Sequence, residues 1–532
     1  MTVNEKLYFN GDILTLEGEL YTEAILVKGD KIHRVGKKEN LLEEASETVE
    51  LIDLQEKTLM PSFIDSHGHF FGYASSFMEV DLTDAIAFDE IAEAIQQFIS
   101  KNNVPDGKWI QGNGYDQNFL SEKVHPTKEI LDKAAPNNPV IVKHKSGHMG
   151  VLNTIGIKEL GITVDTPDPE DGVIEKKNGE VTGYLEEDAF IKYVQEIPMP
   201  SNEEFMESLI KAQNVYASFG VTTVQEGFVV DLLADIFQYL IHKKILKIDL
   251  IGYLDIDNLE ILKQKFTNCF QKYDNHAKIG GYKTFLDGSP QGRTAWMRTP
   301  YLGDEKDYYA YGTQNNEEIE AKLEQALNEN IQILVHCNGD AACQQYINQY
   351  KVAKEKTGST NDIRPVIIHA QLLAEDQLND VKALNMIISF FVAHVYHWGD
   401  IHIKNFGKER ASKISLAKSA QDKGIVYTLH QDAPVIEPDM LETIWCAANR
   451  RTKNGVLLGD DERISPLDAL KAVTKDAAYQ YFEEDIKGTI KEGKLADLVI
   501  LDKNILKVDP MEIKNIQVLE TIKEGETIFK KS

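Results

Sequence analysis

The sequence has few cysteines, no excess of positive charge and no long apolar run. Four cysteines in 532 residues exclude the dense disulfide framework of small secreted domains. No apolar run reaches the roughly 20 residues that a membrane-spanning helix needs, which argues against a membrane protein. A formal net charge of −28 at pH 7 opposes binding to nucleic acid, because phosphates are recognised by basic surfaces.

The composition is that of a large globular protein. With 42% hydrophobic and 27% charged residues, a chain of this length can bury a substantial core and form more than one domain. The first residues, Met1 to Leu7, lack the basic and then apolar layout of a secretory signal peptide. We therefore expect a cytoplasmic protein. The sequence leaves the oligomeric state open, with a homodimer as one alternative.

The most informative segment is an apolar run that ends in two histidines. It reads Met60-Pro61-Ser62-Phe63-Ile64-Asp65-Ser66-His67-Gly68-His69. Because side chains alternate along a strand with period two, His67 and His69 point to the same side. Two neutral imidazoles directed at one point suit a borderline metal such as zinc. A pair of this kind also occurs where a strand simply enters a loop, so the rest of the chain must decide.

Four later apolar runs also end in, or carry, a residue that can bind a metal or transfer a proton. These residues are Lys283, His336, His369 and Asp432, in the segments Gly281 to Asp287, Ile331 to His336, Arg364 to His369 and Gly424 to Asp432. In a barrel of parallel strands, the catalytic groups gather at the carboxyl ends of the strands. The order along the chain therefore predicts one shared site.

The order and the local sequence of these residues resemble the amidohydrolase superfamily of metal-dependent hydrolases. Within it, they resemble the third amidohydrolase group, the YtcJ-like proteins. The resemblance extends from end to end and is carried by Pro61 to His69, Gly107 to Gly112, Gly220 to Val224, Lys283 to Arg293, His336 to Asp340, Gln431 to Val435 and Gly488 to Asp497.

The resemblance and the strand pattern together predict an α/β fold, a (β/α)8 TIM-like barrel. We expect its strands at Ser62 to Ser66, Val221 to Gln225, Ile248 to Tyr253, Tyr282 to Leu286, Gln332 to His336, Pro365 to His369, Met386 to Phe391 and Ile425 to Leu429. Residues 1–57 and 488–532 would form a small β-sandwich domain, and residues 58–487 the barrel. About 150 residues separate the first two barrel strands, far more than a usual βα loop, so residues 70–215 would form an insertion subdomain. Because it leaves from the catalytic face, we expect it to form a wall or lid of the substrate pocket.

The resemblance implies one or two divalent ions, zinc first, held by His67, His69, Lys283, His336, His369 and Asp432. An ammonium group cannot bind a metal. A buried Lys283 with a lowered pKa could instead add carbon dioxide and become a carbamate, an oxygen ligand. The alternatives are a lysine paired with Asp287 or Glu226, and a bridging carboxylate from Glu186 or Glu226. Asp432 would be the acid-base catalyst of a metal-activated water.

Other polar residues near the strand ends are candidates for substrate binding. In the insertion, these are Trp109 and His148, although Trp109 could equally belong to the subdomain core. Arg293 follows the fourth expected strand, and His394 and His397 follow the seventh. Each of these three could bind a carbonyl or carboxylate, or simply pack.

Three functions remain open for a protein with this pattern. The first is a hydrolase of non-peptide, amide-like carbon-nitrogen bonds in a small molecule, with N-acyl or N-formyl amines as plausible substrates. The second is an amino-heterocycle deaminase on the same barrel, although such enzymes usually lack the lysine of the fourth strand. The third is a non-catalytic binding protein, which would be expected to have lost ligands, whereas none is missing. Fold alone selects no substrate.

Overall fold

The computed structural model describes residues 4–145, 148–169, 172–198, 201–303 and 308–531. The chain forms two compact units. The first comprises residues 1–71 and 212–532, and the second comprises residues 72–211. Each unit has its own sheets and its own hydrophobic cores. No helix among the described residues is long and apolar enough to cross a membrane.

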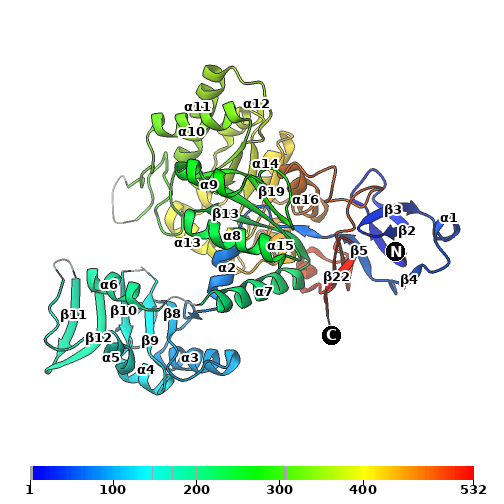
Figure 1. The fold of residues 1–532 in the computed structure, drawn as a ribbon. Coiled ribbons are helices and arrows are strands. Elements are labelled where there is room, and N and C mark those ends of the chain that lie inside the picture. Colours follow the sequence, from blue (N-terminus) through cyan, green and yellow to red (C-terminus); the bar gives the residue numbers. More distant parts are fainter. Residues whose placement is uncertain (1–3, 146–147, 170–171, 199–200, 304–307, 532) are drawn as a thin grey trace. The chain divides into compact units, whose positions relative to one another are not determined.

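The centre of the first unit is a curled sheet of eight parallel strands (Figure 1). In sequence order, the strands are β6 (Phe63–Ile64), β13 (Val221–Val229), β14 (Asp249–Asp255), β15 (Ala277–Phe285), β16 (Gln332–Cys337), β17 (Val366–His369), β18 (Ile387–Phe390) and β19 (Tyr427–Leu429). Neighbours in this order pair in parallel. Each overlaps one of the eight strands expected from the sequence. Most of their residues are buried, as expected where helices cover a parallel sheet.

Hydrogen bonds join the segments that follow the first and last strands of this sheet. The backbone amide of Asp432 donates to the carbonyl of His67 at 3.2 Å, and the amide of His69 donates to the carbonyl of Ala433 at 2.8 Å. The Ser66 hydroxyl donates to the carbonyl of Leu429 at 3.2 Å. The carboxyl ends of β6 and β19 are therefore held together.

Helices follow the strands of this sheet and connect them. They are α2 (Phe70–Ser76), α8 (Asp231–Lys243), α9 (Leu259–Lys265), α10 (Asn316–Glu329), α11 (Asp340–Thr357), α12 (Leu378–Ala383), α13 (His394–Ala411), α14 (Ala417–Asp422), α15 (Met440–Asn449), α16 (Pro466–Ala472) and α17 (Lys475–Gln480). Short 3-10 helices are η1 (Ile256–Asn258), η2 (Glu375–Gln377), η3 (Asp460–Glu462) and η4 (Pro510–Asn515). Local sequence explains where α10 begins. The Asn315 side chain accepts from the Glu318 amide, and the Glu318 side chain accepts from the Asn315 amide, both at 2.9 Å.

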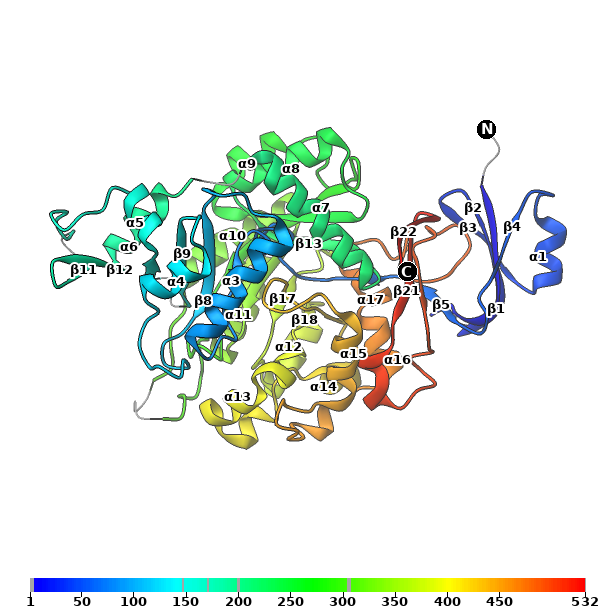
Figure 2. The ribbon, with the colours of Figure 1, turned by 90° about the horizontal axis from the view of Figure 1, so that it is seen from below.

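The two chain ends meet in a second sheet of the first unit (Figure 2). Its order is β22-β21-β20-β5-β1-β2-β3, with β4 paired to β1. The strands are β1 (Glu5–Leu14), β2 (Tyr21–Lys28), β3 (Lys31–Gly36), β4 (Glu50–Asp53), β5 (Thr58–Pro61), β20 (Leu498–Leu501), β21 (Val518–Lys523) and β22 (Glu526–Lys530), with the helix α1 (Lys38–Glu44). Antiparallel pairing of β5 with β20 joins the N-terminal and C-terminal strands. Apolar residues of both ends, such as Ile25, Leu59, Leu498 and Ile522, share one core.

A buried charge cluster connects the C-terminal strands to the parallel sheet. Asp249, the first residue of β14, accepts hydrogen bonds from Lys487 and from His276, the latter at 2.9 Å. It also forms an ion pair with Lys523 of β21 at 2.9 Å. Although burial opposes it, these two lysines hold the pKa of Asp249 well below its usual range. The contribution of Asp249 to stability is therefore present at neutral pH and is lost on acidification.

We expect Asp249→Asn to lower the free energy of unfolding by about 3 kcal/mol or more, because the change removes a buried negative charge that pairs with both Lys487 and Lys523. Asp257→Asn is the matched control. Asp257 pairs with Lys322 at 2.7 Å, but its side chain is 59% exposed, so its loss should cost about 1 kcal/mol or less. Urea unfolding at pH 7 measures both variants. Equal small losses would show that the buried cluster contributes no more than a surface pair.

The second unit contains a six-stranded mixed sheet of order β11-β12-β10-β9-β8-β7. The strands are β7 (Val80–Asp81), β8 (Ile110–Tyr115), β9 (Val140–His144), β10 (Met149–Leu152), β11 (Gly172–Lys177) and β12 (Glu180–Glu187). The helices are α3 (Phe88–Asn102), α4 (Lys128–Ala134), α5 (Thr154–Glu159), α6 (Asp188–Glu196) and α7 (Asn202–Ser218), and α7 continues into the first unit. Two cores lie in this unit. One includes Ile91, Leu131 and Val142, and the other includes Leu152 and Phe190.

Candidate active site

The metal-ligand candidates of the first unit all lie at or just after the carboxyl ends of the parallel strands. His67 and His69 follow β6, Lys283 lies near the end of β15, and Asp432 follows β19. His336 lies in β16, and His369 is the last residue of β17. In the sheet register, His336 pairs with Phe285, and His369 pairs with Cys337. This is the end of the sheet at which barrel enzymes place their reactive groups.

His67, His69 and Asp432 form the most compact group. One ligand atom of each lies within 4.8 Å of the others. The Nε2 atoms of His67 and His69 are 3.7 and 3.6 Å from Oδ1 of Asp432. This oxygen is buried and has no hydrogen-bond partner among the described residues. An unpaired carboxylate oxygen facing two imidazole nitrogens is an arrangement that a cation would stabilise.

His369 and Lys283 lie beside this group. Nε2 of His369 is 3.9 Å from Oδ2 of Asp432, and Nζ of Lys283 is 3.3 Å from Nε2 of His67. Lys283 is fully buried, and the phenyl ring of Phe285 lies 5.2 Å from its Nζ. Of the six ligands expected from the sequence, His67, His69 and His369 thus surround a fourth, Asp432. Lys283 adjoins this group.

The other ring nitrogen of each of these histidines is held by a partner. Nδ1 of His67 is 2.6 Å from Oε1 of Gln225, and Nδ1 of His69 is 3.5 Å from Oε1 of Glu226. Nδ1 of His369 is 3.1 Å from Nε2 of His430. With Nδ1 occupied outside the site, all three rings direct Nε2 towards Asp432. Such outer partners orient metal-binding histidines.

His336 has a different surrounding. Its ring lies 4.6 Å from that of His369, centroid to centroid, and its Nδ1 is 3.3 Å from Oδ1 of Asp287. Asp287 is fixed in turn by the backbone amides of Asn338, Gly339 and Trp296, at 2.7 to 3.0 Å. His336 therefore adjoins the group through His369, and Asp287 lies beside its Nδ1.

Burial shifts the pKa values of the central groups. It lowers the pKa of Lys283 to about 7, so that a large share of the amine is neutral at physiological pH. It raises the pKa of Asp432 and lowers those of His67 and His369 well below their ordinary value, which keeps both imidazoles neutral. His69 is the exception. Burial opposes its charge, but Glu226 and Asp432 raise its pKa.

Two site residues have a left-handed backbone, which residues other than glycine rarely adopt. The φ angle is 70° at His369 and 56° at Asp432. Such conformations cost about 1 to 3 kcal/mol and persist only where the surrounding structure enforces them. Here they turn the chain at the ends of β17 and β19, which directs both side chains towards His67.

The three substrate-binding candidates of the first unit have separate surroundings. His394 is buried, with Nδ1 3.1 Å from Nε2 of His402, and its ring packs on Phe391, which also contacts His430. His397 is turned to Glu442, with 2.8 Å between Nε2 and Oε1. Arg293 lies over the rings of Tyr301 and Tyr308, at 5.5 and 5.8 Å. Among the described residues, none of the three contacts Asp432.

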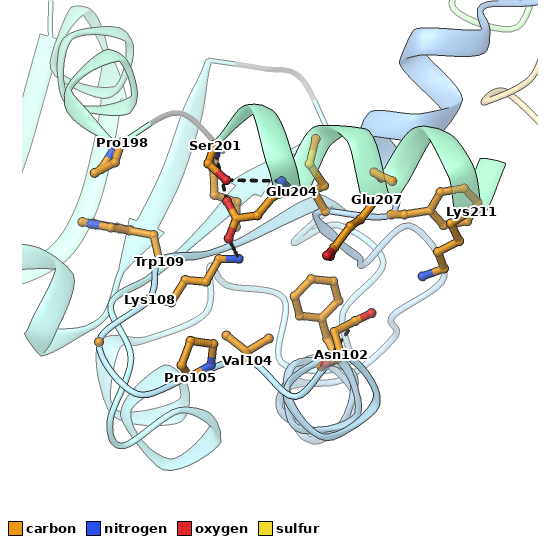
Figure 3. Close-up of a pocket in the computed structure, with 16 residues that line it drawn as sticks. Asn102, Val104, Pro105, Lys108, Trp109, Pro198, Ser201, Glu204, Glu207 and Lys211 are labelled. Carbon is orange, nitrogen blue, oxygen red and sulfur yellow. Dashed lines mark hydrogen bonds and ion pairs between the residues drawn. The ribbon is translucent and has the colours of Figure 1, made fainter. Parts of the chain in front are cut away.

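Trp109 and His148 lie in the second unit. His148 is exposed, and its Nδ1 is 3.0 Å from Oε2 of Glu187; its sequence neighbours Ser146 and Gly147 lie outside the described residues. Trp109 is half-buried against the core and also lines a cavity of about 550 Å³ (Figure 3). The ion pair of Lys108 with Glu204 crosses the wall of this cavity. No other residue of the predicted site lines it.

The two alternative carboxylates for the bridging role lie in different units. Glu226 lies at the site, where it contacts His69 and accepts the backbone amide of Phe71 at 2.9 Å. Glu186 belongs to the second unit and accepts a hydrogen bond from the Tyr184 hydroxyl at 3.1 Å.

Sequence reasoning missed Gln225 and His430, which hold ligands, and Ser389, which contacts His430. It considered Asp287 only as a partner of Lys283, whereas the structure places Asp287 beside His336. For His430 a signal was present. It precedes Asp432 by two positions in the same apolar run, and residues two apart in a strand share a side. Gln225 likewise ends the strand expected at Val221 to Gln225. For Ser389, the sequence carries no comparable signal.

A second group of metal-binding residue types consists of Asp249, His276 and Glu524. Lys523 forms ion pairs with Asp249 and Glu524, at 2.9 and 3.1 Å, and Lys487 binds Asp249. The lysines already balance these carboxylates, so this group belongs to the charge cluster described above.

Comparisons with known proteins identify the family of this chain. The model of the amidohydrolase family matches residues 50–529, and the chain belongs to that family. It is 26% identical to the amidohydrolase YtcJ of Bacillus subtilis, over 99% of each chain. It is 23% identical to the N-substituted formamide deformylase of Arthrobacter pascens, over 98% of each. An uncharacterized metal-dependent hydrolase from Pyrococcus furiosus has a similar structure, with a TM-score of 0.76 and 26% identity, covering 94% of this chain and 100% of that one.

Proposed function

We propose that this protein is a metal-dependent hydrolase that cleaves an amide-like, non-peptide carbon-nitrogen bond in a small molecule. The observation that carries the proposal is the convergence of three Nε2 atoms, from His67, His69 and His369, on the carboxylate of Asp432. The family supports the hydrolytic reaction. The intact set of ligands argues against a protein that kept the fold only for binding.

The donor set fits a divalent metal. Imidazole nitrogen with carboxylate oxygen is typical of zinc and similar ions. The buried Oδ1 of Asp432, which lacks a hydrogen-bond partner among the described residues, supplies a negative charge where His67 and His369 are neutral. When bound, such an ion supplies a Lewis acid for the scissile carbonyl and a water with a pKa of about 7.

Asp432 is the residue we assign to proton transfer. A carboxylate beside the attacking water accepts its proton and can then donate that proton to the leaving nitrogen. The left-handed backbone of Asp432 and the hydrogen bond from its amide to the carbonyl of His67 fix its direction.

Lys283 is the residue we assign to the bridging ligand, as a carbamate formed with carbon dioxide. Its pKa of about 7 leaves enough neutral amine to add to carbon dioxide, and its burial protects the product from water. Its Nζ lies 3.3 Å from the Nε2 of His67, so the carbamate oxygens would reach the same site. With this ligand, His67, His69, His336, His369 and Asp432 would hold one or two ions.

We also propose that the parallel sheet closes into a complete (β/α)8 barrel. The support is the set of hydrogen bonds that join the segments after β6 and β19, from Ser66, His69 and Asp432. Closure would bring His67 and Asp432, from the two edges of the sheet, to one end of the barrel.

N-Formyl and N-acyl amines are the substrates we propose to test first. The support is the similarity to an N-substituted formamide deformylase along almost the whole length of both chains. The identity of 23% leaves room for a different amine or acyl group.

We expect the protein, purified without chelator, to contain at least one equivalent of divalent metal and to hydrolyse members of a panel of N-formyl amines, N-acyl amines and lactams. Removal of the metal should abolish turnover, and zinc or manganese should restore it. Elemental analysis of the metal and release of the amine measure the two results.

His67→Ala should lose the metal, whereas His33→Ala, a change at an exposed histidine, should retain it. A wild-type protein that stays without metal after reconstitution would refute the proposal.

A further inference from the structure

A chain of buried hydrogen bonds leads away from His369. Nδ1 of His369 is 3.1 Å from Nε2 of His430, and Nδ1 of His430 is 2.8 Å from the hydroxyl of Ser389. The Ser389 hydroxyl is 3.2 Å from that of Ser66, which is 3.2 Å from the carbonyl oxygen of Leu429. His430, Ser389 and Ser66 are all fully buried. Each neutral imidazole and each hydroxyl in this chain has one proton to donate.

The carbonyl of Leu429 sets the direction of this chain, because a carbonyl oxygen only accepts hydrogen bonds. The Ser66 hydroxyl uses its one proton on Leu429 and therefore accepts from Ser389. Ser389 has then used its own proton and must accept from Nδ1 of His430. Nε2 of His430 is left as an acceptor, so that Nδ1 of His369 is the donor.

Nε2 of His369 consequently carries a lone pair and faces Asp432 at 3.9 Å. We propose that Ser66, Ser389 and His430 form a positioning relay that holds His369 in its Nδ1-protonated tautomer, ready to bind a metal through Nε2. The inference rests on the proposed metal site. The three residues are not among the proposed metal ligands and act through His369.

An independent arrangement gives His67 the same tautomer. The side-chain amide of Gln225 donates to the carbonyl of Ser66 at 3.0 Å, which identifies its nitrogen and directs its oxygen to Nδ1 of His67 at 2.6 Å. Nδ1 of His67 must therefore donate, and Nε2 carries a lone pair. Two ligands are thus set to the same tautomer, and Ser66 takes part in both arrangements, through its hydroxyl for His369 and through its carbonyl for His67.

Removal of one hydroxyl tests the relay. In Ser389→Ala, the proton on Nδ1 of the buried His430 has no acceptor, so the tautomer of His430 with the proton on Nε2 becomes favourable. His430 then donates to Nδ1 of His369. The proton of His369 consequently moves to its Nε2, where it competes with metal. We expect the affinity for zinc, measured by competition with a chromophoric chelator, to fall about 10- to 100-fold, the usual effect of losing an outer partner of a ligand. Ser62→Ala is the matched control. It removes another buried hydroxyl, which is bonded to Thr222 at 2.6 Å outside the relay, and should bind zinc like the wild type.

The tautomers can also be measured in the metal-free wild-type protein. Histidine ring nitrogens in a 15N-labelled sample should show His369 and His430 both protonated at Nδ1, assigned by loss of the corresponding signals in His369→Gln and His430→Gln. Signals that place the proton of either ring on Nε2 would overturn the relay, as would unchanged zinc affinity in a folded Ser389→Ala. A wild-type protein that binds no zinc would overturn the proposed function instead, and the nitrogen signals would still decide the tautomers.

Discussion

Asp432→Asn is expected to lower turnover by at least about a hundredfold, the lower end of the contribution of general acid-base catalysis. Asparagine keeps the size of the side chain and one oxygen, but it cannot accept a proton from water. His67, His69 and His369 remain in place, so the metal content should stay near that of the wild type. Measurements of kcat, KM and metal content on the same preparation separate loss of chemistry from loss of metal.

The control for this experiment is Asp422→Asn, at an exposed aspartate of α14 that pairs with Lys418. It should retain normal turnover and metal. An Asp432→Asn protein with full metal and near-normal turnover would remove Asp432 from the mechanism. Glu226, 3.5 Å from Nδ1 of His69, would then be the next base to test.

Lys283→Ala is expected to lose both metal and activity, because the side chain would supply the bridging ligand. The fall in metal affinity should exceed the roughly 10- to 100-fold effect of losing an outer partner. Formate, acetate or bicarbonate should restore part of the activity, since a small carboxylate can occupy the space of the carbamate. The readouts are zinc affinity and turnover, each with and without added acid.

Two results would contradict the assignment of Lys283. One is a metal-loaded crystal structure with an unmodified Lys283 and Glu226 bound to the metal. The other is a Lys283→Ala variant that binds metal as tightly as the wild type. Lys322→Ala serves as the control for the loss of a lysine. Lys322 pairs with the exposed Asp257 outside the site, and its variant should gain nothing from added acids.

Each strand of the parallel sheet could be predicted from the sequence because the evidence for it is local. A short apolar run ending in a polar residue specifies a buried strand and the side chain at its end without information from elsewhere in the chain. His336 and His369 were found in this way. The two histidines of His67-Gly68-His69 were found from the alternation of side chains along one strand.

Other expectations depended on contacts that no local pattern contains. His397 was a candidate for substrate binding, yet its ring is turned to Glu442, 45 residues later in the chain. Glu186 and Glu226 were equal rivals in the sequence. The structure places Glu226 against His69 and Glu186 in the second unit, because only Glu226 belongs to a strand that pairs with β6.

The sequence by itself determined which residues stand at the strand ends and in which order, since each of these positions follows from a few neighbouring residues. Only the tertiary structure decided which nitrogen of each histidine faces the site. That choice depends on the partner of the other nitrogen, which is 158 residues from His67 in the case of Gln225 and 61 residues from His369 in the case of His430. Folding alone brings such partners within hydrogen-bonding distance, and the site has its chemistry only when they are there.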